Sequence, residues 1–268
     1  MTEIQESDLT RQTGIHGGYA AMQEGHDWSV DSPITPRDQE RSCTSFMLDA
    51  LSDMLATYRS RLVGDRMLDV GCGYGGLARL VATDLGIGEA HGIDVDETVL
   101  EEATSKGVLA LHADISQGPL PYPDGYFDFI TSFGMLDYLP VFDDALDEIY
   151  RILKPNGHVL ISLPNLASWH NRLFLLMGYQ PRDVEISREM LPGVHPYYRR
   201  QGNIIGHIHA PTTRAFKELM EHTGFRTVAI RGVQPLATRQ FLPIQQIDRF
   251  LTRWPNLARR FFYLGQKP

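Results

Sequence analysis

The stretch from Met67 to Gly76 constrains the fold of this chain more than any other. It reads Met-Leu-Asp-Val-Gly-Cys-Gly-Tyr-Gly-Gly, an apolar strand that runs into a glycine-rich turn, and a helical pattern begins at Leu77. Gly71, Gly73 and Gly75 let the backbone adopt positive φ and approach a ligand that a Cβ would push away, while N–H groups at the helix start point at its polar end. A strand, a glycine turn and a helix in this order predict a nucleotide site.

Two further acidic residues follow the glycine turn at intervals typical of successive βαβ units. Asp94 ends an apolar stretch at 90–94, where its carboxylate can accept hydrogen bonds from both hydroxyls of a ribose. Asp114 ends a third apolar stretch, and a fourth follows at 127–133. The glycines alone also fit the G-x-G-x-x-G pattern of dinucleotide sites, so they do not show which of two adenosine-containing cofactors is bound. The acid after the third stretch argues against NAD, because a dehydrogenase does not require it.

With these residues in order, the chain resembles the class I S-adenosylmethionine (SAM) dependent methyltransferases from about residue 46 to residue 268. The family's first motif matches 69–75, its ribose acid matches Asp94 and its adenine-contacting acid matches Asp114. A later signature at 145–157, a helical pattern followed by a Lys-Pro-Asn-Gly turn, is similar to the small-molecule, type 11-like branch of that family.

The resemblance implies SAM as the cofactor and methyl transfer to a small-molecule acceptor, by an in-line displacement that depends mainly on positioning. One position departs from the family, because Tyr138 stands where a histidine is common, so the resemblance supplies no base there. The residues expected to bind the cofactor are Asp69, Gly71, Cys72, Gly73, Gly75, Asp94, Val95, Asp114, Ile115, Ser132 and Phe133.

Strand and helix patterns alternate along the chain, which predicts an α/β fold of the Rossmann-like type with seven strands, mostly parallel, and helices on both faces. By resemblance, the last two strands form an antiparallel hairpin at the edge of the sheet. Residues 1–44 are expected to form an arm, and 45–268 the methyltransferase domain. The expected strands are 66–70, 89–93, 108–112, 127–132, 158–163, 225–232 and 260–266, and apolar spacing predicts helices at 46–62 and 243–254.

The segment 178–206 interrupts this alternation with prolines, glycines and several aromatic residues. A loop of this length is commonly functional, and its aromatic content argues for packing, so we interpret it as a lid over the acceptor; an inert insertion or a dimer contact is the alternative. Aromatic residues of the arm, the lid and the loops after the strands are the expected walls of the acceptor pocket: Tyr19, Trp28, Tyr138, Trp169 and Tyr197.

A base is needed only if the acceptor's nucleophile carries a proton of low acidity. The candidates for such a base are His26, His170, His195, His207 and His209, the last three foremost, although a structural histidine is the commoner role for each. His207 and His209 are two residues apart, so an extended segment would place them on one face. Asp137 with Asn165 could imitate an acidic metal site, but the rest of that pattern is absent and no metal is predicted.

Composition sets the expected surroundings of the protein. The two cysteines favour a reducing compartment. The first residues are polar and no apolar run reaches membrane length, which predicts a cytoplasmic protein without a membrane partner.

A net charge of −8 disfavours a nucleic-acid partner. Residues 1–177 hold 11 Lys and Arg against 27 Asp and Glu, a balance of −16, whereas 178–268 hold 14 against 6, a balance of +8. Such asymmetry could steer an anionic substrate, join two subunits in a homodimer, or mark a solvated face.

A second resemblance covers about a third of the chain. The segment 163–173, with a later His-Ile-His-Ala-Pro-Thr-Thr run at 207–213, is similar to the methionine-biosynthesis protein W (MetW) group, which has a SAM-type fold and is associated with homoserine acylation. It implies an alternative function, a partner protein of an acyltransferase that transfers no methyl group. The intact cofactor motifs and the predicted lid favour the enzyme.

Overall fold

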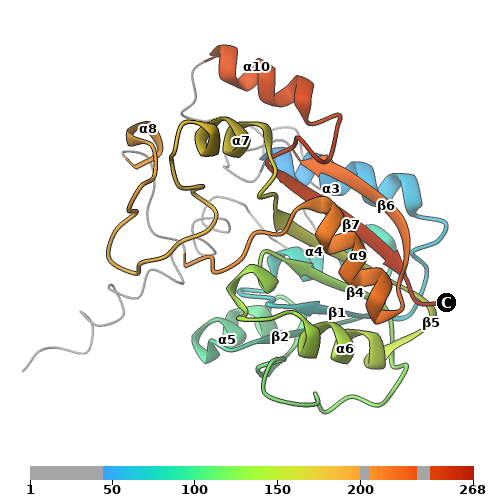
Figure 1. Ribbon diagram of the computed structural model, residues 1–268. Helices are drawn as coiled ribbons and strands as arrows, with labels where there is room; N and C mark the ends of the chain where they lie inside the picture. Colours follow the sequence, from blue (N-terminus) through green and yellow to red (C-terminus); the bar gives the residue numbers. More distant parts are fainter. Residues whose placement is uncertain (1–44, 200–205, 234–241) are drawn as a thin grey trace, which may run out of the picture.

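A seven-stranded sheet forms the centre of the computed structural model (Figure 1), which describes residues 45–199, 206–233 and 242–268. The strand order is β3-β2-β1-β4-β5-β7-β6. The first five strands are parallel, and β7 is antiparallel to both of its neighbours, β5 and β6. The strands are β1 (Arg66–Val70), β2 (Glu89–Asp94), β3 (Leu109–His112), β4 (Phe127–Phe133), β5 (Leu153–Pro164), β6 (Arg226–Val233) and β7 (Arg260–Gln266).

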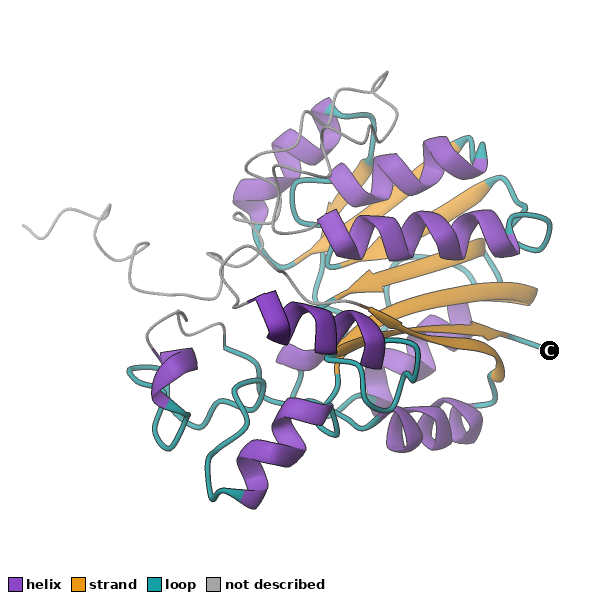
Figure 2. Cartoon of the chain, turned by 90° about the horizontal axis from the view of Figure 1, so that it is seen from above, coloured by secondary structure: helices purple, strands orange, loops and turns teal. Residues whose placement is uncertain are grey.

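Helices cover both faces of this sheet (Figure 2). One face carries α3 and α4, and the other carries α6 and α9. The helical segments are α3 (Ser45–Tyr58), α4 (Gly76–Leu85), α5 (Glu97–Ser105), the 3-10 turn η2 (Leu136–Tyr138), α6 (Asp143–Ile152), α7 (Trp169–Leu176), α8 (Pro196–Arg199), α9 (Thr213–Thr223) and α10 (Leu242–Leu251). None of the described helices is long and apolar enough to cross a membrane.

Alternation along the central strands builds two separate apolar cores, because successive Cβ atoms of a strand point to opposite faces. In β5, Val159, Ile161 and Leu163 pack in the core under α6 and α9, whereas Leu160 packs in the core under α3 and α4. All four are fully buried. A strand buried on both faces carries apolar residues without interruption, which is why the sequence pattern of β5 is continuous rather than alternating.

The carboxyl ends of the parallel strands meet at one edge of the sheet, which is where ligands bind in open α/β folds. The glycine loop leaves this edge after β1, and the turn η2 leaves it after β4, the strand next to β1. The antiparallel strand β7 begins at the same edge, since its first residue Arg260 is level with Pro164, the last residue of β5. Three chain segments that are distant in sequence therefore converge at this edge.

The expected fold is confirmed, including the antiparallel C-terminal edge, and the differences concern element ends. β5 begins at Leu153 instead of 158, because Leu153 pairs with Phe127 of β4 ahead of a register shift. The next residues are tied to the end of the chain: the Asn156 N–H donates to the Lys267 carbonyl, and the Lys267 N–H donates to the Gly157 carbonyl. α3 ends at Tyr58 and α10 at Leu251, each earlier than predicted. The predicted arm 1–44 lies outside the described residues.

Residues 178–199, most of the predicted lid, pack with α7 beside the main sheet (Figure 1). The Gln180 N–H donates to the Gly193 carbonyl at 2.9 Å, which closes a loop within the segment. Leu191 and Val194 are buried and pack against Phe174 of α7. This segment therefore has a small apolar cluster of its own. Its role as a lid stays a prediction.

Candidate cofactor and acceptor site

The glycine loop after β1 has the backbone conformation that the sequence predicted. Gly71, Gly73 and Gly75 have φ of 77°, 49° and 77°, all in the left-handed region. The N–H groups of Gly71 and Cys72 both donate to the Ile93 carbonyl at 2.9 Å, which ties the loop to β2. The loop is thus fixed in position beside the end of the neighbouring strand.

Two of the loop residues face the protein interior. A Cβ at Gly75 would lie 2.9 Å from the backbone Cα of Ala103, so glycine at this position allows α5 to pack against the loop. The Cys72 side chain is buried against Gly92, and burial raises the pKa of its thiol far above the usual range. Cys72 therefore offers a ligand its backbone and not its thiol.

Asp94, the last residue of β2, lies beside the glycine loop. Its Oδ2 accepts a hydrogen bond from the Gly73 N–H at 2.8 Å, and its Oδ1 accepts one from the Asp96 N–H at 3.0 Å. Each carboxylate oxygen has a further lone pair, so the group can accept two more bonds from a ligand. The next residue, Val95, is an apolar side chain that is 59% exposed. A fixed carboxylate beside an open apolar side chain suits a nucleoside.

Asp114 and Ile115 follow β3 at the same edge. The Oδ1 of Asp114 accepts bonds from the N–H and the hydroxyl of Ser116, while no described residue donates to its Oδ2. Ile115 is buried in the core beneath. The third strand therefore presents one carboxylate oxygen toward this edge of the sheet.

Asp69 is buried and joins β1 to β4. Its Oδ1 accepts a hydrogen bond from the Thr131 hydroxyl at 2.7 Å. Burial raises the pKa of Asp69 to about 7, the charge of Asp94 adds to the rise, and the Thr131 hydrogen bond opposes it. The next two residues of β4, Ser132 and Phe133, are also buried. Asp69 thus fixes the end of β1, from which the glycine loop leaves, to the neighbouring strand β4.

The raised pKa of Asp69 predicts a pH-dependent stability. Between about pH 4 and pH 7 the folded state keeps a proton that the unfolded chain has lost, so stability decreases as pH rises through this window. We expect Asp69→Asn to gain stability relative to the parent on going from pH 5 to pH 8, on the order of 2 kcal/mol. Urea unfolding at both pH values measures this. A difference between the two proteins that is equal at pH 5 and pH 8 would contradict the prediction.

A buried imidazole–carboxylate pair lies beyond the end of β4. The Nε2 of His207 is 3.0 Å from the Oδ2 of Asp137, and the two side chains are 7% and 0% exposed. The Nδ1 of His207 is buried and has no hydrogen-bond partner. Both side-chain oxygens of Asp137 are likewise buried without a hydrogen-bond partner, so the two groups face each other at ion-pair distance but without hydrogen-bond geometry.

Two segments, η2 and the predicted lid, hold His207 in this position. The N–H groups of Ile208 and His209 donate to the Asp137 carbonyl at 2.8 and 3.2 Å, and the N–H of Glu185 in the predicted lid donates to the His207 carbonyl at 3.0 Å. The His207 ring also lies edge-on to Tyr138, with centroids 5.2 Å apart. Burial, with the charge of Asp137 adding to it, raises the pKa of Tyr138 well above its usual range.

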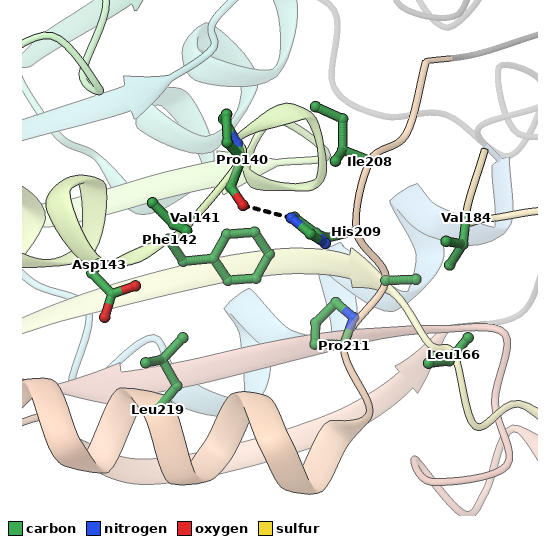
Figure 3. Close-up of a pocket in the computed structure, with 11 residues that line it drawn as sticks. Pro140, Val141, Phe142, Asp143, Leu166, Val184, Ile208, His209, Pro211 and Leu219 are labelled. Carbon is green, nitrogen blue, oxygen red and sulfur yellow. Dashed lines mark hydrogen bonds between the residues drawn. The ribbon is translucent and has the colours of Figure 1, made fainter. Parts of the chain in front are cut away.

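His209 occupies different surroundings, although it is only two residues away. Its ring is exposed, and its Nε2 lies 2.6 Å from the Pro140 carbonyl, to which it can donate (Figure 3). Figure 3 shows the apolar pocket that it lines, with Phe142 and Leu219 among the walls. The expectation that the two histidines present one common face is therefore wrong: one is buried against Asp137, and the other is exposed on the side of α6 and α9.

The remaining predicted site residues are placed as follows. His195 stacks on Phe174 at 5.1 Å within the segment beside α7. The Trp169 indole N–H donates at 2.6 Å to Asp248, which also holds Arg259, so this N–H serves the attachment of α10 to α7 and β7. Tyr19 and Trp28 lie outside the described residues, and the Tyr197 side chain is not described.

Sequence reasoning considered Asp137 only as a metal ligand and missed it as the partner of a histidine. The signal available was an acidic residue directly after an apolar strand, in Leu136-Asp137-Tyr138. Asn165, its proposed metal-site partner, uses its amide instead to donate to the carbonyls of Pro255 and Ala258. Among the residues that the structure describes, no group of three or more His, Cys, Asp or Glu could hold a metal ion.

Comparison with known proteins decides the family. A family model described as a methyltransferase domain matches residues 39–230, most of the chain. The chain belongs to this methyltransferase family. The expected class is thereby confirmed, and the seven-stranded fold agrees with it.

Two curated relatives illustrate the similarity of the methyltransferase domain. A demethylmenaquinone methyltransferase of Listeria welshimeri is 33% identical over 118 residues, covering 40% of this chain and 49% of the relative. The ubiquinone/menaquinone biosynthesis C-methyltransferase UbiE of Cupriavidus metallidurans is 35% identical over 104 residues, covering 37% and 42%. The chain thus spans about half the length of the curated relatives it matches.

Solved structures share the fold. A SAM-dependent methyltransferase from Archaeoglobus fulgidus superposes with a TM-score of 0.54 at 19% identity, covering 82% of this chain and 94% of that one. A protein from Galdieria sulphuraria, described as a putative sarcosine dimethylglycine methyltransferase, superposes with a TM-score of 0.57 at 16% identity, covering 94% and 97%.

Proposed function

We propose that this chain is a SAM-dependent methyltransferase whose small-molecule acceptor carries a proton on its nucleophile, and that His207 takes that proton. The Asp137–His207 pair carries the proposal. It follows β4, the strand hydrogen-bonded to β1, and the glycine loop follows β1. Neighbouring strands are about 4.8 Å apart, so the two loops leave the sheet side by side.

The loop residues fit the cofactor. Gly73 adopts positive φ beside Asp94, whose carboxylate is held by two backbone N–H groups and has lone pairs left for the ribose hydroxyls. Val95 offers an exposed apolar surface for the adenine, and Asp114 offers a carboxylate oxygen for its edge. The other residues assigned to the cofactor are Asp69, Gly71, Cys72, Gly75, Ile115, Ser132 and Phe133. When bound, SAM supplies a methyl group on a sulfonium, which a correctly placed nucleophile takes by in-line displacement.

Proton transfer is the task of the chain's own residues. With its proton on Nε2, beside the Asp137 carboxylate, His207 leaves the lone pair of Nδ1 for the acceptor's proton. The carboxylate then stabilises the imidazolium that forms. Because both side chains are buried, their electrostatic interaction is stronger than it would be in water. Proton acceptance of this kind contributes about 100- to 10,000-fold in rate.

The predicted lid and the aromatic residues near the pair complete the acceptor site. Glu185 of the lid holds the His207 backbone, so the lid is coupled directly to the base. Tyr138 contacts the His207 ring and is proposed as a wall of the pocket, and Trp169 and Tyr197 stay predicted as further walls. Exclusion of water by these segments would favour methyl transfer over side reactions.

The curated relatives differ in the acceptor that their names give. Those from Listeria and Cupriavidus are named for quinones, while a Caenorhabditis elegans relative, 32% identical over 105 residues, is named for phosphoethanolamine. The acceptor is therefore proposed from the site and not from a relative's name.

Mass spectrometry of the purified protein, followed by SAM calorimetry, tests the proposal. We expect retained SAM or S-adenosylhomocysteine, and micromolar SAM binding to the protein stripped of it. A panel of phenols, alcohols and amines, assayed by the release of S-adenosylhomocysteine, then identifies the acceptor class. A folded protein that binds neither cofactor form would overturn the proposal.

A further inference from the structure

A second cationic group lies at the same edge of the sheet. Arg260 is the first residue of β7, level with the last residue of β5 and separated from β4 by β5. Nevertheless, its Nη2 lies 3.1 Å from the point that a Cβ of Gly134 would occupy, directly after β4. The Arg260 side chain therefore lies across the carboxyl end of β5 and brings its guanidinium to the start of η2.

The Arg260 guanidinium has no acceptor among the described residues, and its Nε is buried without a hydrogen-bond partner. Its neighbour Arg259 shows the usual arrangement, since it forms a two-pronged ion pair with the buried Asp248 at 2.9 and 2.7 Å. A half-buried cation that leaves its donors unused is unfavourable unless a bound group compensates it.

Two acidic groups lie near Arg260, and neither forms an ion pair with it. The Oδ1 of Asp137 is 4.0 Å from the same virtual Cβ of Gly134, and its Oδ2 is 3.0 Å from His207. Burial acts to raise the pKa of Asp183, but the charges of His170, His207, Arg182 and Arg260 lower it. Asp137 is thus near both Arg260 and His207, and a molecule bound beside it would meet the N–H donors of the guanidinium and the His207 ring.

The backbone leaves space in front of Arg260, and the segment that supplies Arg260 is basic as a whole. Gly134 has a φ of 69°, and a side chain there would press on the guanidinium, so glycine keeps the space in front of Arg260 open. The segment 178–268, which supplies Arg260, His207 and the predicted lid, carries a balance of +8. The guanidinium fork matches the oxygens of a carboxylate or a phosphate.

We infer that Arg260 binds an anionic group, a carboxylate or a phosphate, on the acceptor whose nucleophile faces His207. The inference rests on the proposed function, because it places that acceptor in the same site. It defines the substrate class as small molecules that carry both an acidic group and a protonated nucleophile. Arg260 is a specificity-determining residue in this account, and proton transfer stays with His207.

Nuclear magnetic resonance of the ¹⁵N-labelled protein, saturated with S-adenosylhomocysteine, tests the inference. Sodium acetate and inorganic phosphate are titrated separately at constant ionic strength, with the Gly134 amide and the Arg260 Nε–H as reporters. We expect a saturable shift with at least one anion, and the responding anion shows whether a carboxylate or a phosphate is recognised. Arg260→Gln should weaken that binding at least tenfold, and Arg260→Lys should weaken it less.

Arg226→Gln is the matched control, because Arg226 lies at the opposite end of β6 and is exposed. It should bind the anion as the parent does. No saturable shift in the parent, or equal binding by folded Arg260→Gln, would overturn the inference. Calorimetry with S-adenosylhomocysteine on the same samples keeps the two proposals apart, since failure of that binding would count against the proposed function alone.

Discussion

Asp94→Ala is expected to weaken SAM binding by about 2 to 4 kcal/mol, or roughly 30-fold or more, while the protein stays folded. The carboxylate is already held by the N–H groups of Gly73 and Asp96, so it meets the ribose hydroxyls without further ordering. Its removal takes away both ligand bonds and leaves the Gly73 N–H without its partner. Isothermal titration calorimetry with SAM, together with a melting curve, measures the two effects separately.

Two further variants sharpen this test. Asp94→Asn keeps one carbonyl acceptor and should lose less affinity than Asp94→Ala. Glu101→Ala removes an exposed acid from α5, outside the loop, and should bind SAM as the parent does. If folded Asp94→Ala binds SAM with the parent's affinity, the ribose is held elsewhere.

His207→Gln should reduce turnover by about 100- to 10,000-fold with little change in SAM affinity. The variant keeps a hydrogen-bonding side chain of similar length but cannot accept the acceptor's proton. Asp137→Asn should also reduce turnover strongly, because an amide no longer selects the orientation of the ring or stabilises its cation. Steady-state assays with the acceptor found in the panel give kcat and KM for each.

A merely structural His207 would give a different pattern. If it removes the proton, raising the pH until the acceptor ionises by itself should restore much of the rate of His207→Gln. A structural role would leave the variant slow at every pH. His222→Gln, an exposed histidine at the end of α9, is the control and should match the parent. Parent-like turnover in His207→Gln would remove the base from the mechanism.

The two predicted functions, methyl transfer and a MetW-like partner role, are not equally supported. The methyltransferase family and fold are confirmed, whereas the MetW-like association with an acyltransferase stays a prediction that no observation tests. The proposed base, a buried histidine whose Nδ1 has no hydrogen-bond partner, has a use in catalysis and none that a partner protein requires. The SAM binding and turnover experiments above distinguish the two.

The sequence by itself determined the glycine loop and the acids after the strands, which are the residues proposed to bind the cofactor. Gly71, Gly73 and Gly75, and the acids that end successive strands, form local patterns, because a turn, a strand and a helix start each depend on a few consecutive residues. The order of these patterns also gave the sheet and its antiparallel edge. Element ends were less accurate, as at β5, where pairing of Leu153 with Phe127 of β4 extends the strand beyond the predicted start.

The proposed acceptor half rests on the tertiary structure alone. The sequence named several histidines as candidates, and burial beside Asp137 is the reason to propose His207, while His209 lies exposed two residues later. Arg260 had no sequence signal at all, because its side chain reaches Gly134 across an intervening strand. Contacts of this kind depend on which strands are neighbours and on where each side chain points, and residues distant in the chain acquire those relations only when the sheet forms.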